Sequence, residues 1–181
     1  MTVGRGSPIH CRLRDTQNDH SRHFWGYVQV IGDLSDLDAF VPAFGEWVEA
    51  CWFGEQERAE ARLEALLAFP PDVVLVGALT ILSRLLELSD PRGFAPALGD
   101  VGDMGQALAE HLLITGPDPD REALIRAVVA GAGADPAARR ELLVTYGTEA
   151  VTAAALECSS VLTQALANRW GVVPSNVLED F

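Results

Sequence analysis

The chain has 181 residues, of which 49% are hydrophobic, and it carries a formal net charge of −13 at pH 7. This length suits one domain with a sizeable core, and the acidic balance disfavours nucleic-acid binding because it repels phosphates. The chain contains no run of about 18 apolar residues that would indicate a membrane-spanning helix. Residues 1–24 also lack the apolar stretch of a secretory signal. We therefore expect a soluble, cytoplasmic protein.

Residues 1–23 are polar, contain glycine and proline, and show no periodicity, which predicts a flexible tail. Four potential zinc ligands in this tail have no known motif spacing: His10, Cys11, His20 and His23. We interpret them as solvated side chains, and we expect no metal and no cofactor. Residues 24–34 fit either a strand or one helix face; a helix is favoured because the chain offers no convincing partner strand.

Helical periodicity, capping residues and Gly/Pro stops predict a single all-helical domain over residues 24–171. Ser35 has the spacing of a capping box, and Pro42 either kinks the helix that follows or begins a second one. The further expected helices are 55–69, 73–88, 103–115, 119–130, 136–146 and 149–169. Residues 89–101 are predicted to form a loop, and 172–181 an extended tail.

The longest apolar run is Val73–Leu88, bounded by prolines on both sides. A run of this length predicts a buried helix, since strands usually stop at four to eight residues. We expect the other helices to pack around it.

An internal repeat accompanies this central run. A shift of 77 positions aligns residues 42–88 with 119–165, and 12 of the 47 aligned residues are identical. This predicts a three-helix unit used twice; the alternative is convergence of two amphipathic, alanine-rich segments. Because a free-standing solenoid usually needs about three repeats, we expect an all-α protein of six or seven helices. It would form a compact bundle or a short stack that resembles HEAT repeats in architecture only.

The repeat also bears on the cysteines. Three cysteines far apart favour a reducing compartment over a disulfide framework. Cys51 aligns with Val128, and Cys158 with Ile81, so both thiols are predicted to be buried and inert. The shared leucines of the third helix are the predicted common core: Leu79 and Leu85, with Leu156 and Leu162.

Acidic residues concentrate in residues 33–64, which hold nine acids against two arginines. The segment Phe44–Phe53 is apolar except for two glutamates, and its Trp47 and Trp52 lie about 140° apart on a helix. Either this helix is central or one tryptophan is exposed as a contact residue. The core is favoured because the second copy has apolar residues at both positions, Leu124 and Val129.

No catalytic constellation emerges, and no catalytic residue is predicted. We therefore expect a non-enzymatic interaction module, such as an adaptor or an immunity-type inhibitor, that presents an acidic helical face to a protein with a basic surface. The candidate interaction residues are Glu46, Glu49, Glu57, Glu60, Trp47 and Trp52. One alternative is a ligand- or metal-binding enzyme with a pocket between the repeats near Glu110 and His111. Another is a homo-oligomer closed by the aromatic helix.

Overall fold

The structure is a computed structural model that describes residues 34–89, 104–113, 116–179 and 181. Several predictions lie outside these residues: the tail, the helix or strand at 24–34 apart from Leu34, the four potential zinc ligands and most of the 89–101 loop. Within them every regular element is a helix, which confirms the all-α prediction. The described residues all belong to one compact unit.

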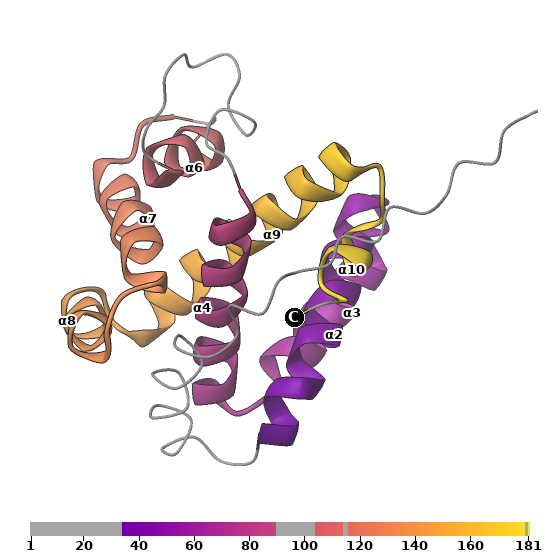
Figure 1. Cartoon of the computed structure of the whole chain (residues 1–181), viewed down its shortest axis with the longest axis horizontal. Helices are drawn as coiled ribbons and strands as arrows, with labels where there is room; N and C mark the ends of the chain where they lie inside the picture. Colours follow the sequence, from indigo (N-terminus) through magenta and orange to yellow (C-terminus); the bar gives the residue numbers. More distant parts are fainter. Residues whose placement is uncertain (1–33, 90–103, 114–115, 180) are drawn as a thin grey trace, which may run out of the picture. The chain divides into compact units, whose positions relative to one another are not determined.

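Eight helices occupy the described residues, more than the six or seven predicted (Figure 1). They are α2 (Leu34–Trp52), α3 (Gln56–Leu67), α4 (Pro71–Leu88), α6 (Met104–Leu112), α7 (Pro119–Ala132), α8 (Pro136–Tyr146), α9 (Thr148–Trp170) and α10 (Pro174–Val177). The predicted helices agree with these bounds to within a few residues. Pro42 neither ends nor divides the first helix, since α2 runs through it as one element.

The prediction of an extended C-terminal tail is wrong for residues 174–178. Pro174 occupies the first position of α10, where its missing N–H costs no hydrogen bond. Pro174, Val177 and Leu178 are buried because this short helix packs on α2 and α9. Burial of these side chains gives the chain end a fixed place that local sequence patterns did not indicate.

The centre of the fold is the pair α4 and α9, which share the most extensive helix–helix contact (Figure 1). Ser159 Oγ of α9 donates a hydrogen bond to the carbonyl oxygen of Ala78 on α4, 3.4 Å away. The four leucines predicted as the common core are all buried, which confirms that prediction: Leu79, Leu85, Leu156 and Leu162. Val73, near the start of α4, is buried, whereas Ala150, near the start of α9, is only half-buried.

Two groups of helices flank the central pair. In Figure 1, α2, α3 and α10 lie on one side and α6, α7 and α8 on the other. On the side of α2, the side chains of Phe40, Phe44 and Val48 are fully buried. On the side of α7, those of Ile125 and Val128 are fully buried. The helices α3 and α8 lie outermost and each buries a single leucine, Leu66 and Leu142 respectively. Most of the residues of these two helices are exposed in the described structure.

The 23-residue helix α9 is long and apolar enough to cross a membrane, as α3 and α4 would be together despite their bend of 114°. We expected no segment long and apolar enough to span a membrane, and α9 does not meet that expectation. In the fold, 61% of the apolar window of α9 is buried. Such burial is typical of the core helix of a soluble protein, whose apolar residues contact other helices.

Candidate interaction surface

The carboxylates predicted as one acidic face point in two directions. Glu46 of α2 forms an ion pair with Arg62 of α3, with 2.9 Å between its Oε2 and Nη1 of the arginine. Glu49, one turn later, is half-buried and accepts a hydrogen bond from the Ser175 hydroxyl of α10. Both side chains are therefore engaged within the fold, and neither is a freely presented contact.

Glu57 and Glu60 are exposed on α3, together with Glu64, which the sequence analysis did not include. At 100° per residue the three side chains lie within an arc of about 60° on the side of α3 opposite to the buried Leu66. No ion pair within 4.0 Å involves any of the three in the described part of the chain. Glu64 could have been found from its place seven residues after Glu57.

The two arginines of α3 are turned away from this outer face. Arg58 Nη1 lies 2.7 Å from Glu55 Oε2, and this hydrogen bond and charge raise the pKa of Arg58. Arg62 reaches back to Glu46 on α2. Exposed ion pairs of this kind add little stability, but they neutralise the two arginines locally. The outer face, defined by Glu57, Glu60 and Glu64, therefore stays acidic.

An apolar side chain lies beside the acidic outer face. Leu67 ends α3 and is 56% exposed, while Leu63, one turn earlier, is half-buried. With Glu60 and Glu64 they follow the spacing i, i+3, i+4, i+7, which places all four on one side of the helix. The surface of α3 thus combines carboxylates with leucine.

Trp47 and Trp52 are both half-buried, so the prediction of a core position holds only in part. The Trp47 ring packs edge-on against the fully buried Phe44, with 5.6 Å between ring centroids. No described contact identifies either tryptophan as a partner site. Their role in an interface or in a homo-oligomer stays a prediction.

The prediction that Cys51 is buried is wrong, because its thiol is exposed. Val128, its aligned residue, is fully buried. Val48 of α2 and Ile125 of α7, which are aligned, are both buried. The other buried residues of α2 lie mainly before Val48, whereas those of α7 lie after Ile125. The burial of Val128 therefore does not predict the burial of Cys51, although the two residues are aligned.

Cys158 is buried, as predicted, and burial raises the pKa of its thiol to about 12. A thiol with this pKa is almost entirely protonated at neutral pH, and the protonated form is not the nucleophile. Cys158 therefore has the character of a small core residue, which confirms the interpretation of its alignment with Ile81.

Glu110 and His111, the alternative pocket residues, are both exposed on α6. Glu110 accepts a hydrogen bond from Gln106 Nε2 at 2.9 Å, and Gln106 accepts one from Arg126 of α7 at 3.3 Å. No group of three metal-binding side chains occurs among the described residues. Two surface depressions formed by described residues have linings that do not include Glu110 or His111.

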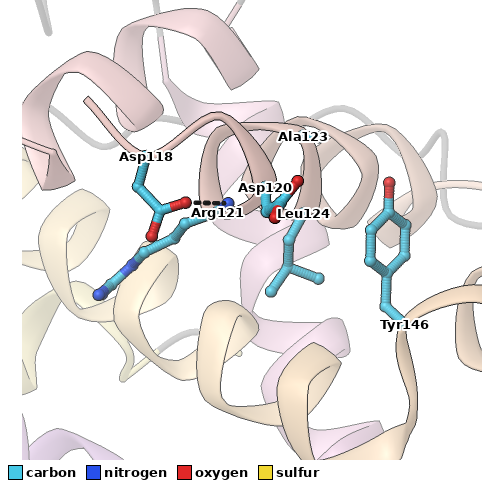
Figure 2. Close-up of a pocket in the computed structure, with 6 residues that line it drawn as sticks. All are labelled: Asp118, Asp120, Arg121, Ala123, Leu124 and Tyr146. Atoms are coloured by element: carbon cyan, nitrogen blue, oxygen red, sulfur yellow. Dashed lines mark hydrogen bonds between the residues drawn. The ribbon is translucent and has the colours of Figure 1, made fainter.

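The larger depression lies between the first turn of α7 and the end of α8 (Figure 2). Its lining comprises Asp118, Asp120, Arg121, Ala123, Leu124 and Tyr146. Asp118 caps α7 by accepting a hydrogen bond from the backbone N–H of Arg121, 3.1 Å away. The Arg121 guanidinium forms an ion pair with Glu157 at 2.7 Å. Capping and this ion pair explain Asp118 and Arg121 without a ligand. The second depression is lined by residues 55–58 at the start of α3.

Comparison with family models, with curated proteins and with solved structures finds no match for this chain. Its surface is therefore interpreted from its own residues. The outer face of α3 brings together three carboxylates that form no ion pair among the described residues, beside an exposed leucine.

Proposed function

We propose that the chain is a non-enzymatic protein–protein interaction module, either an adaptor or an immunity-type inhibitor, that binds a basic partner through α3. The observation that carries this proposal is the uncompensated outer face of α3. Nine of the twelve residues of α3 are exposed, and Glu57, Glu60 and Glu64 have no basic neighbour within 4.0 Å in the described structure. The proposed contact residues therefore do not include Glu46 and Glu49, because these two side chains bind other residues of the fold.

Electrostatics explains how such a face would act. The partner's lysines or arginines would approach three carboxylates that form no ion pair among the described residues. One of them, Glu60, accepts a hydrogen bond from the neutral amide of Gln56, 3.1 Å away. Complementary charge mainly accelerates encounter and selects partners, and it is screened by salt. The overall charge of −13 adds a long-range attraction for basic proteins and a repulsion of acidic ones.

The duplication of a three-helix unit, α2–α3–α4 and α7–α8–α9, is part of the same proposal. It is supported by the starts of α4 and α9, at residues 71 and 148, which are 77 positions apart. Both helices also bury the same aligned positions: Val74/Val151, Ala78/Ala155, Leu79/Leu156, Ile81/Cys158, Leu82/Ser159 and Leu85/Leu162. In this arrangement α8 is the counterpart of α3, and it offers matched control residues.

The proposed location is the cytoplasm. The support is chemical: Cys51 carries an exposed thiol, and free thiols of this kind persist where the compartment is reducing.

Capture of partners from native lysate tests the proposal. The immobilised full chain is compared with a variant in which Glu57, Glu60 and Glu64 are replaced by glutamine, and we expect at least one partner to be lost from that variant. The control replaces three exposed glutamates elsewhere, Glu141, Glu149 and Glu179, and thus changes the net charge equally. An identical partner set for all three proteins, or equal losses from both variants, would contradict the role of α3.

A further inference from the structure

We infer that the partner element bound by this face is a basic amphipathic helix packed along α3. This rests on the proposed function and names the chemistry of its partner. The inference starts from the register of the surface: Glu60, Leu63, Glu64 and Leu67 occupy one side of α3 at i, i+3, i+4 and i+7. That spacing is the one by which helices present side chains to other helices.

Leu67 provides the apolar part of the contact. Leu67 lies in the last turn of α3 and is 56% exposed. The inner side of α3 is occupied by the buried Leu66, so Leu67 does not contribute to the core. Packing a partner leucine or the aliphatic stem of a lysine or arginine over Leu67 and Leu63 would remove apolar surface from water. An extended or flat basic segment would satisfy the carboxylates and leave this leucine exposed.

The other described helices cover little of α3, since nine of its twelve residues are exposed. Among the described helices α3 packs mainly on α2 and has a smaller contact with α4, since the chain bends by 114° between α3 and α4. The twelve residues of α3 span about 18 Å, which corresponds to about three turns of a partner helix. Such a partner would place apolar residues toward Leu63 and Leu67 and basic residues toward Glu57, Glu60 and Glu64.

Charge and register together select α3 over its proposed counterpart α8. Glu57 and Glu60 align with Ala134 and Ala137, and Leu63 aligns with Arg140. Two of the three carboxylates are therefore missing, and a positive charge replaces a leucine. Val144, which aligns with Leu67, is 81% exposed. A basic helix would be repelled by Arg140, and α8 therefore offers an exposed apolar residue without the matching charge.

Two synthetic peptides of equal composition test the inference on the full chain. Both contain 14 residues of leucine, alanine and arginine; one places its leucines on a single helical face, and the other is scrambled so that no face forms. We expect the amphipathic peptide to bind at least tenfold more tightly by titration calorimetry and to gain helical circular dichroism on binding. Amide chemical shifts should move along α3.

Two matched variants separate packing from charge. Leu67→Ser should weaken the amphipathic peptide about tenfold and leave the scrambled peptide unchanged, while Val144→Ser on α8 should change neither. Both sites are exposed, and equal thermal unfolding of the variants confirms that the fold is intact. Equal binding of the two peptides, no effect of Leu67→Ser, an effect of Val144→Ser, or no binding of the amphipathic peptide would each overturn the helix-docking inference.

These outcomes differ from a failure of the proposed function. If the triple glutamine variant loses a native partner but Leu67→Ser retains it, α3 binds by charge alone and the partner is not a packed helix. If the triple variant retains every partner, the acidic face itself is not the interaction surface.

Discussion

Gly77 of α4 lies directly against the ring of Phe40 of α2, so closely that a β-carbon at Gly77 would come within 2.6 Å of Phe40 Cε1. Phe40 is fully buried and also packs edge-on against Phe69, with 5.8 Å between ring centroids. The absence of a side chain at one position of the central helix therefore sets how closely α2 approaches it. Through α2, it also supports α3 and its acidic outer face.

Replacement Gly77→Ala is expected to destabilise the protein by about 1–3 kcal/mol, because overpacking forces the Phe40 ring to move. This loss occurs although alanine is favoured over glycine in a helix by about 1 kcal/mol. Urea unfolding measures the change. In the double variant Gly77→Ala/Phe40→Leu the two effects should not add, since the smaller side chain relieves the overlap. Stabilisation by Gly77→Ala alone would disprove this account.

Replacement Leu79→Ala is expected to cost about 2–5 kcal/mol, as is typical when a buried leucine is truncated and leaves a cavity. Leu156, at the aligned position of α9, should show a cost of the same size. Leu67→Ala on the exposed side of α3 is the control and should change stability by less than about 0.5 kcal/mol. A cost below about 1 kcal/mol for Leu79→Ala would show that α4 is not central to the core.

The two described cysteines should differ in their reaction with a thiol reagent. In a Cys11→Ser background we expect one thiol, Cys51, to react in the folded protein and a second, Cys158, to react only after unfolding. The cause is exposure, since Cys51 is exposed and Cys158 is buried. Partial burial also raises the pKa of Cys51, so its reaction should be slower than that of a free thiol. Mass spectrometry of the labelled protein counts the sites, and two rapid labels would contradict the packing around α9.

Stability should fall at alkaline pH because of Cys158. Burial raises its pKa from 9.0 to about 12, so the protonated thiol contributes its full stabilisation below pH 9, and this contribution is lost as the pH rises toward 12. The slope over that window is about 1.4 kcal/mol per pH unit. Compared with Cys158→Val, the wild-type protein should lose about 1 kcal/mol between pH 8 and pH 10. If the wild-type protein and Cys158→Val lost stability equally between pH 8 and pH 10, the thiol would not be ionising in the unfolded chain alone, and this account would be wrong.

Local sequence signals determined the helices well. Asp135 and Gly147 enclose the predicted helix 136–146, and the structure has α8 at those bounds, with the Asp135 carboxylate accepting hydrogen bonds from Ala137 and Ala138. Caps and apolar periodicity act over about four residues, so a single stretch contains all the information that they need. The burial of the central run and its leucines could be predicted for the same reason.

The direction in which each polar side chain points was decided only by the tertiary structure. Glu49 bonds to Ser175, 126 residues away, and Glu46 pairs with Arg62 across two helices. Neither partner is visible in a local pattern, and the same holds for the exposure of Cys51 and the packing of α10. The sequence therefore determined an acidic, all-helical chain with a buried central run. Contacts between distant residues decided which carboxylates form ion pairs and which, on the outer face of α3, do not, because burial and charge pairing depend on which helices meet in space.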